Sequence, residues 1–203
     1  MGLLDQHIYL ASASPRRREL LKQIGVNFEV LLLRALSPRT DVDETPIPGE
    51  QPEEYVVRVA RAKAKTAWQV IEARRLPKHG VLAADTTVSL NGEILGKPVN
   101  RENAEEMLRK LSGKRHRVYT SVAMSCESRL EVKLSVSEVV FAELNEAEIK
   151  RYVMTGEPMD KAGGYAIQGR AAAFVSRIEG SYSGVMGLPL YETAQLLKQF
   201  GVG

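Results

Sequence analysis

Residues 80–98, GVLAADTTVSLNGEILGKP, carry the clearest strand and turn signals in the chain. The first half of this segment is an almost continuous apolar run, which is typical of a strand buried on both faces. The dipeptide Asn91-Gly92 follows, the strongest short signal for a tight hairpin turn, and the next residues return as a partner strand. We therefore expect a buried strand over residues 80–90 and a β-hairpin closed by Asn91-Gly92.

An aspartate stands in the middle of this apolar run. Burial of Asp85 costs free energy unless the carboxylate is paired, hydrogen-bonded or turned toward a cleft. Lys97 lies across the expected hairpin at a nearly matching distance from the turn, which brings a carboxylate and an ammonium group to one site. Such a pair indicates a catalytic site, and the alternative is that Asp85 is a structural cap at a strand end.

Toward the N-terminus, residues 10–25, LASASPRRRELLKQIG, predict a strand that leads into a short helix. Ser14 is a good N-cap, Pro15 suits the first helical position and Gly25 is a stop signal. Apolar residues repeat at helical spacing between them. We expect an amphipathic helix that begins near Pro15.

Three arginines, Arg16, Arg17 and Arg18, fall in the first turn of this helix. Unpaired N–H groups and the peptide dipole favour carboxylates there, and each exposed cation costs about 0.3–1 kcal/mol. One interpretation is a solvated basic turn. The other is an anion site, because a helix N-terminus that follows a strand binds phosphate and arginine adds paired donors.

The remaining N-terminal segments predict two buried strands, at residues 8–11 and 27–33, and a helix over residues 52–74. Between them, residues 34–52 are rich in proline and hold a cluster of carboxylates that includes Glu44, which indicates a long functional loop. Lys63 falls on the apolar stripe of the expected helix. It either extends along the edge of the packed face or lines a cleft.

The C-terminal half alternates helices with half-buried strands. Asn100 can cap a helix over residues 101–112, and Asn145 with Glu148 resembles a capping box before another helix. Between these helices two alternating stretches predict an antiparallel pair. A glycine-rich stretch begins with Asp160 and Lys161 and leads to a last helix over residues 189–200. The pattern indicates an α/β fold with a mixed sheet and a central cleft between two lobes.

Composition excludes several classes of protein. A chain of 203 residues with 44% hydrophobic content is expected to form a single domain over residues 1–203, and its net charge of +3 is only mildly basic. Aromatic residues make up 6%, and none is interleaved with the basic turn, which argues against nucleic acid. The single cysteine, Cys126, and the lack of a membrane span or leader pattern predict a cytoplasmic protein. The sequence contains neither a Walker loop nor a Rossmann fingerprint.

Five ordered motifs resemble those of one family: LASASPRRRELL, VDET, AADTTVSLNGEILGKP, DKAGGYAIQG and GSYSGVMGLPL. Together they cover nearly the whole chain and are similar to the motifs of the Maf family of nucleotide pyrophosphatases. The resemblance implies a two-lobed mixed-sheet fold similar to the inosine-triphosphate pyrophosphatases, a single Maf-like domain and a homodimer. It also implies hydrolysis of a nucleoside triphosphate to the monophosphate and pyrophosphate.

Residue by residue, Asp85 resembles the catalytic acidic residue of this family, described as a proton acceptor. Arg16, Thr86 and Gln168 resemble its specificity positions. Their combination is similar to the branch that acts on dTTP and UTP, whereas the branch that acts on 7-methyl-GTP tends to carry tryptophan, glutamine and glutamate. The resemblance therefore implies a pyrimidine nucleotide as substrate.

From these residues we expect water to attack the α-phosphorus, with Asp85 either accepting the proton or holding a divalent metal. Glu44 and Asp85 are the best metal candidates, for magnesium or manganese, since oxygen ligands suit hard cations. Gln168 can offer a donor and an acceptor to a uracil or thymine edge. The phosphate charge would be neutralised by Lys97, which is also a catalytic candidate, and by Arg17, Lys63 and Lys161.

Two further functions compete with this interpretation. One is a nucleotide-binding regulator of septum formation without essential turnover, which the family's association with septum inhibition suggests. The other is a pyrophosphatase of the 7-methyl-GTP type. The presence of both Asp85 and Lys97 favours an enzyme over a regulator, because a pure binder needs basic groups but no catalytic carboxylate.

Overall fold

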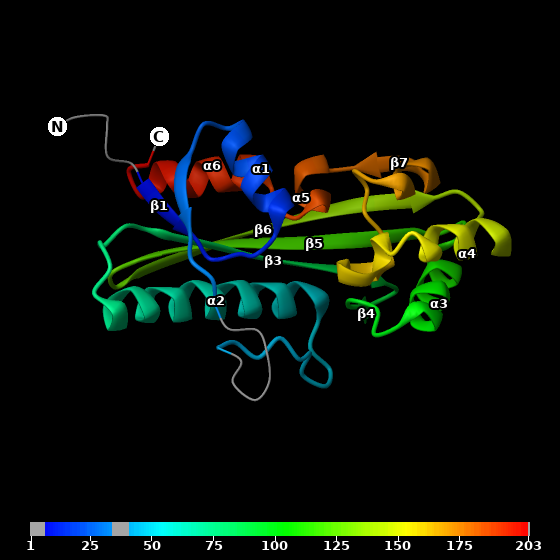
Figure 1. Ribbon diagram of the computed structural model, residues 1–203, viewed down its shortest axis with the longest axis horizontal. Coiled ribbons are helices and arrows are strands. Elements are labelled where there is room, and N and C mark those ends of the chain that lie inside the picture. Colours follow the sequence, from blue (N-terminus) through cyan, green and yellow to red (C-terminus); the bar gives the residue numbers. More distant parts are fainter. Residues whose placement is uncertain (1–6, 34–40, 203) are drawn as a thin grey trace.

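The computed structural model describes residues 7–33 and 41–202, and its centre is a seven-stranded mixed sheet (Figure 1). Six strands follow the order β2-β1-β3-β5-β6-β7, and β4 pairs with β3. The parallel pairs are β1 with β2 and β1 with β3, and the remaining pairs are antiparallel. The strands are β1 (His7–Leu10), β2 (Asn27–Val30), β3 (Val81–Leu90), β4 (Glu93–Leu95), β5 (Arg115–Cys126), β6 (Arg129–Phe141) and β7 (Val175–Glu179).

Helices cover both faces of the sheet. Helix α2 lies along one face, α1, α5 and α6 lie on the other, and α3 and α4 gather at one end (Figure 1). The bounds are α1 (Pro15–Gln23), α2 (Pro52–Arg74), α3 (Arg101–Leu111), α4 (Glu146–Met154), α5 (Tyr182–Met186) and α6 (Leu190–Gln199). Three short 3₁₀ turns follow α4, namely η1 (Glu157–Asp160), η2 (Ala162–Gly164) and η3 (Arg170–Phe174). The expected mixed α/β fold is confirmed, and among the described residues no helix is both long and apolar enough to cross a bilayer.

The alternation of side chains along β3 decides which face each one meets. Leu82 and Ala84 pack in the core under α1 and α6, whereas Val81 and Ala83 pack in the core under α2. Continuing the same period of two, Asp85 falls on the α2 face and Thr86 on the opposite face. A separate core, built around Val88, Leu108 and Phe141, fills the other end of the sheet.

Several sequence predictions are confirmed in detail. The Asn91-Gly92 hairpin joins β3 to β4, helix α2 runs from Pro52 to Arg74 as expected, and β5 and β6 form the antiparallel pair. Asn100 caps α3 by accepting a hydrogen bond from the backbone of Asn103, and Asn145 forms the expected capping box with Glu148. These local signals hold because each depends on neighbouring residues only.

Other predictions need correction. The segment 27–33 is not a buried strand, because β2 ends at Val30 and lies at the edge of the sheet with alternate residues exposed. Ser14 stands at the N-cap of α1, but its side chain makes no capping hydrogen bond. The glycine-rich stretch, for which the sequence predicted no elements, contains η2, η3, β7 and α5. The expected loop over residues 34–52 is described only from Asp41 onward.

Candidate active site

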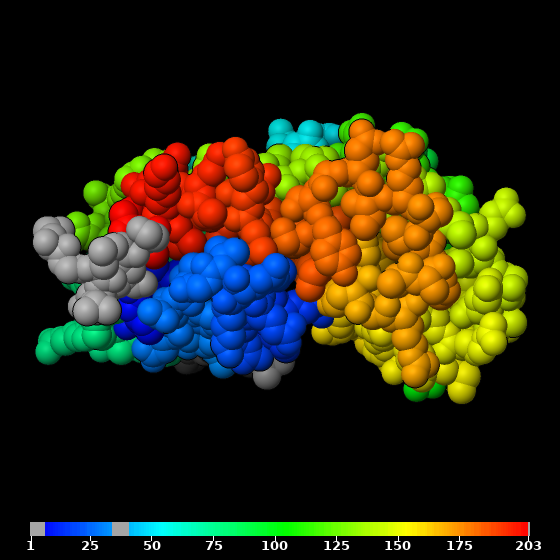
Figure 2. Space-filling model, turned by 90° about the horizontal axis from the view of Figure 1, so that it is seen from above, coloured from blue at the N-terminus to red at the C-terminus, as the bar shows by residue number. Residues whose placement is uncertain are grey.

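A cleft of about 930 Å³ opens between the two ends of the molecule. Figure 2 shows the surface hollowed where the blue N-terminal segment meets the yellow segment that follows α4. Its walls come from segments far apart in the sequence: residues 11–17, 42–46, 85–88, 94–97, 160–168 and 185–187. The expected central cleft is therefore present, and it collects five of the motifs found in the sequence.

The cleft lies beside an unpaired stretch of the central strand. On one edge, β3 pairs with β1 only at Val81 and Leu82 and with β4 only from Val88 to Leu90. Residues 83–87 have no strand partner on that edge within the described ranges, although β5 pairs with the other edge from Val81 to Ser89. Because the strand borders the cleft here, side chains from both of its faces reach the same cavity.

Asp85 lies at the centre of the cleft and is 6% exposed. Its Oδ1 accepts a hydrogen bond from Lys63 Nζ at 2.8 Å, and the same amino group lies 3.0 Å from Oε1 of Glu44. The other oxygen, Oδ2, is buried without a hydrogen-bond partner among the described residues. Burial raises the pKa of Asp85, and the positive charges of Lys63 and Arg17 partly offset this effect.

The structure decides between the two interpretations of Lys63. Its side chain is 14% exposed and lines the cleft between two carboxylates, so it does not extend to the helix edge. Helix α2 also carries Tyr55, two i+4 steps before Lys63, whose hydroxyl donates to the backbone oxygen of Glu44 at 2.9 Å. One face of α2 therefore holds both the loop with Glu44 and the carboxylate of Asp85.

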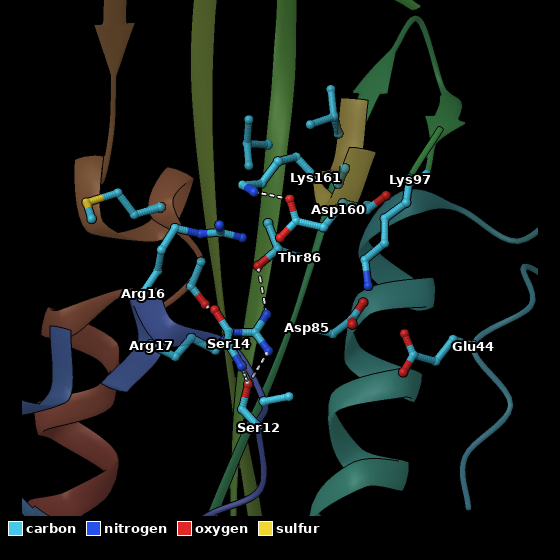
Figure 3. Close-up of a pocket in the computed structure, with 18 of the residues that line it drawn as sticks. Ser12, Ser14, Arg16, Arg17, Glu44, Asp85, Thr86, Lys97, Asp160 and Lys161 are labelled. Atoms are coloured by element: carbon cyan, nitrogen blue, oxygen red, sulfur yellow. Dashed lines mark hydrogen bonds and ion pairs between the residues drawn. The ribbon is translucent and has the colours of Figure 1, made fainter. Parts of the chain in front are cut away.

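The ion pair expected between Asp85 and Lys97 is replaced by the pair with Lys63. Strand β4 ends at Leu95, so Lys97 lies beyond the paired part of the hairpin. Lys97 is nevertheless part of the cleft wall, and its amino group points toward Asp85 (Figure 3). The cleft thus contains two lysines near one buried carboxylate, and only the first forms an ion pair with it.

Arg17 connects three parts of the site. Its guanidinium donates from Nε to Gly187 O at 2.7 Å, from Nη1 to Ala84 O at 2.7 Å and Ser12 Oγ at 3.3 Å, and from Nη2 to Thr86 Oγ1 at 3.3 Å. The bond to Ala84 O satisfies a backbone acceptor of the unpaired stretch of β3, in place of a neighbouring strand. Most of the five N–H donors of Arg17 are therefore committed to the protein.

Arg16 and Lys161 face the cleft from opposite walls. Figure 3 shows Arg16, from the first turn of α1, directed toward Asp160 and Lys161 at the end of η1. Lys161 forms an ion pair with Asp160. The arginine turn is therefore not simply a solvated surface, since both Arg16 and Arg17 line the cavity.

The end of the cleft that contains Gln168 is mainly apolar. Ala166, Ile167 and Met186 line it together with Gln168, whereas Asp85, Glu44 and Lys63 line the cleft from other segments of the chain. Thr86 lies between the two ends, and its hydroxyl is bonded to Arg17 and to the buried Thr120. The cavity is thus polar at one end and suited to a flat apolar group with hydrogen-bonding edges at the other.

Close packing holds this wall against the central strand. Gly163 has φ +68°, and a Cβ atom there would lie 2.9 Å from the Cβ of Val88 on β3. Its backbone N–H donates to Gly96 O at 3.0 Å, which attaches the wall to the loop that carries Lys97. Only glycine meets both demands at this position.

Sequence reasoning missed several residues that support the site. Tyr55 was hidden in an apolar helix stripe, and Ser12 and Thr120 gave no signal of their own. Tyr152 and Glu157 bracket the segment of Gln168 through hydrogen bonds. The tandem of Glu157 and Pro158 before Asp160 and Lys161 was the only local sign of a constrained turn there.

The donor set of the cleft suits a hard divalent cation. Asp85 Oδ2 is a buried carboxylate oxygen with no partner in the part of the chain that the structure describes, and Glu44 supplies a second carboxylate beside it. No group of three or more histidine, cysteine, aspartate or glutamate side chains is placed to hold an ion within residues 7–33 and 41–202. An ion bound by Asp85 and Glu44 would therefore share its coordination with substrate phosphates and water, as magnesium commonly does.

A sheet with helices on both faces and a cleft that joins carboxylates, lysines and an apolar end defines an α/β protein that binds a phosphorylated small molecule. The chain belongs to the Maf family, because the family model described as Maf-like protein matches residues 7–200. The resemblance found in the sequence is thereby confirmed.

Curated relatives match almost the whole chain. A protein of Aromatoleum aromaticum named dTTP/UTP pyrophosphatase is 56% identical over 203 residues, which cover 99% of this chain and 98% of the relative. Relatives with the same name from Dechloromonas aromatica and Nitrosomonas europaea are 55% and 54% identical, covering 96% of this chain and 97% and 95% of their own lengths. The solved structure of the Staphylococcus aureus Ham1 protein has a TM-score of 0.50 at 20% identity, covers 96% of this chain and 97% of its own, and shows the fold alone.

Proposed function

We propose that this protein is a hydrolase that converts dTTP and UTP to the nucleoside monophosphate and pyrophosphate. The observation that carries this proposal is Asp85, a buried carboxylate with one unpartnered oxygen that faces a cleft between Lys63 and Lys97. The shared name of relatives at 54–56% identity over nearly the whole chain supports the same substrates. Nothing in the site favours the regulator or the 7-methyl-GTP alternative.

The chemistry begins with a water molecule at Asp85. Lys63 holds Oδ1, which leaves Oδ2 free to accept a proton as the water oxygen attacks the α-phosphorus. The bond between the α-phosphorus and the bridging oxygen of the β-phosphate breaks, so pyrophosphate leaves and the proton stays on Asp85 until solvent removes it. A raised pKa makes Asp85 a stronger base than an exposed aspartate, provided that it is ionised at the working pH.

Cationic side chains would stabilise the triphosphate. Lys97 and Arg16 line the cleft on either side of Asp85, and Lys161 would exchange its ion pair with Asp160 for a phosphate. Arg17 acts at the same end mainly by holding the walls together, with its charge directed at the cavity. When bound by Asp85 and Glu44, magnesium or manganese would supply further Lewis-acid stabilisation of the phosphate charge.

The apolar end would hold the base. Ala166, Ile167 and Met186 supply its apolar surface, and the amide of Gln168 offers both a donor and an acceptor to a uracil or thymine edge. Thr86 and Arg16 stand between base and phosphates, in keeping with their resemblance to specificity positions. We also propose that the protein is a homodimer of single-domain subunits in the cytoplasm, which the family resemblance and the single Cys126 support.

The test is pyrophosphate release from a panel of nucleoside triphosphates in the presence of magnesium or manganese. Release from dTTP and UTP in preference to CTP, GTP and 7-methyl-GTP is the expected result. Tight binding of a nucleotide with no release would support the regulator, and preferential release from 7-methyl-GTP would support the other branch. Asp85→Asn, measured in parallel, guards against release by a contaminating hydrolase.

A further inference from the structure

The segment that carries Gln168 is held from behind by two residues outside the cleft. Ala166 N donates to the hydroxyl of Tyr152 at 3.2 Å, and this hydroxyl donates to Glu157 Oε1 at 2.9 Å. The other carboxylate oxygen, Oε2, accepts a hydrogen bond from Arg170 N at 3.2 Å. Glu157 therefore holds one backbone amide on each side of Gln168. It binds the amide of Arg170 by a direct hydrogen bond and the amide of Ala166 through the hydroxyl of Tyr152.

The donors and acceptors in this chain of hydrogen bonds can be assigned in only one way. A carboxylate only accepts, so the single proton of the Tyr152 hydroxyl must go to Glu157. The hydroxyl oxygen is then free to accept from Ala166 N. Burial and the bond to Glu157 both raise the pKa of Tyr152, so the hydroxyl keeps its proton at neutral pH. Tyr152 is 3% exposed, which excludes competing water.

Gly169 makes room for the carboxylate. Its φ of −104° is open to any residue, so its conformation does not require glycine. A Cβ atom at this position would lie 2.3 Å from Glu157 Oε1 and 2.6 Å from Oε2. The missing side chain thus allows Glu157 to sit directly against the segment beside Gln168.

Glu157 is itself well anchored and does not line the cleft. Its backbone N–H donates to Thr155 Oγ1 at 3.2 Å, and that hydroxyl donates to Tyr152 O at 2.6 Å. The carboxylate is thereby tied to the end of α4. Any influence on a ligand must pass through the backbone of residues 166–170.

We infer that Glu157 is a positioning residue for nucleobase recognition, and that it acts with Tyr152 by clamping the segment that presents Gln168. This inference rests on the proposed function, because it takes the apolar end of the cleft as the site of a uracil or thymine base. Glu157→Gln places an amide N–H against one of the two donors, Tyr152 O–H or Arg170 N–H, and so breaks one side of the clamp.

The experiment measures recognition of the base and recognition of the phosphates separately, in the variants Glu157→Gln, Tyr152→Phe and Gly169→Ala. We expect the KM for UTP to rise about tenfold in each variant while kcat changes less than about threefold, a loss similar to one good hydrogen bond. Inorganic triphosphate, used as a competitive inhibitor, reports on the phosphate end, and its inhibition constant should stay within about twofold of the parent. Glu157→Gln combined with Tyr152→Phe should show little further loss, because both changes break one network.

Glu146→Gln is the matched control, because Glu146 lies on α4, the helix that also carries Tyr152, but pairs with Arg109 at the surface. Two results would overturn the inference. One is an equal weakening of UTP and of inorganic triphosphate in the variants, and the other is an unchanged KM for UTP in well-folded Gly169→Ala and Tyr152→Phe. Calorimetry with UMP separates the two proposals, since it needs no turnover. If the parent binds UMP but releases no pyrophosphate, the proposed activity fails, and a roughly tenfold weaker UMP affinity in the variants still supports the clamp.

Discussion

The amino group of Lys63 lies 2.8 Å from Oδ1 of Asp85, and this ion pair joins the middle of helix α2 to the unpaired stretch of the central strand. Both side chains are largely buried, so neither is free to turn toward solvent. The pair fixes Oδ1 and leaves Oδ2 without a hydrogen-bond partner among the described residues.

Asp85→Asn should lower the rate of pyrophosphate release by about a thousandfold, because an amide does not accept the proton of the attacking water. The melting temperature should be preserved or raised, since a buried charge is removed. Pyrophosphate release measures the first effect and calorimetry with UTP shows that binding survives. Unchanged turnover would remove Asp85 from the mechanism.

Lys63→Met should shift the acidic limb of the profile of kcat/KM against pH to higher pH. Asp85 must be ionised to act as a base, and burial already raises its pKa. Loss of the lysine charge removes the largest opposing effect, so the pKa rises further and activity is lost at a higher pH as the solution is acidified. Lys65→Met is the control, because Lys65 is exposed on the same helix. A profile that stays in place would show that Lys63 does not stabilise the ionised carboxylate.

Arg16→Ala and Arg17→Ala should differ in kind. Arg16 lines the cleft, so its loss should raise the KM for UTP about tenfold or more with the melting temperature unchanged. Arg17 donates four hydrogen bonds to three parts of the chain, so its loss should lower both activity and the free energy of unfolding, the latter by about 2 kcal/mol or more. Arg18→Ala, in the same turn, provides the control. Kinetics for Arg16→Ala that match the parent would refute the anion site.

The free energy of unfolding should fall as the pH drops from about 6.5 to about 4, owing to His116. Burial lowers the pKa of His116 from 6.5 to about 4, so the unfolded chain binds a proton in this range and the folded protein does not. The loss is about 3 kcal/mol by linkage. Urea unfolding at pH 7 and pH 4 measures it, and His116→Gln should flatten the dependence. An equally steep fall in that variant would assign the effect to other groups.

Much of the fold was accessible from local patterns. The hairpin at Asn91-Gly92, the capping box of Asn145 with Glu148 and the bounds of α2 each depend on a few adjacent residues, and the sequence predicted them correctly. The prediction of a buried strand over residues 27–33 was wrong because an apolar composition does not distinguish a central strand from an edge strand. Its place in the sheet depends on pairing with residues far along the chain.

In the site, too, the sequence identified individual residues but not the partners that the fold brings to them. Asp85 was evident as a charge inside an apolar strand, and Lys63 as a charge on an apolar helix face. The predicted partner of Asp85 was Lys97, however, because the two residues lie at similar distances from the hairpin turn. Strand β4 stops at Leu95, and the helix on the other side of β3 supplies the closer lysine. Arg17 was expected at phosphate, whereas its donors are largely taken up by backbone and hydroxyl oxygens that only the folded chain brings together.

Along the unpaired stretch of β3, whether a residue position is odd or even decides which face of the sheet its side chain occupies, and therefore its role in the site. Asp85 and Thr86 are neighbours that point to opposite faces of one strand, and both reach the cleft because the strand is bare at that edge. A deletion of one residue between Val81 and Asp85 that kept Val81 in its pairing and shifted the later residues by one position would turn Thr86 toward Lys63 and Asp85 toward Arg17. The same side chains would then surround the same cavity with acid and hydroxyl exchanged, so point substitutions can tune this site gradually, whereas single-residue insertions and deletions would invert it in one step.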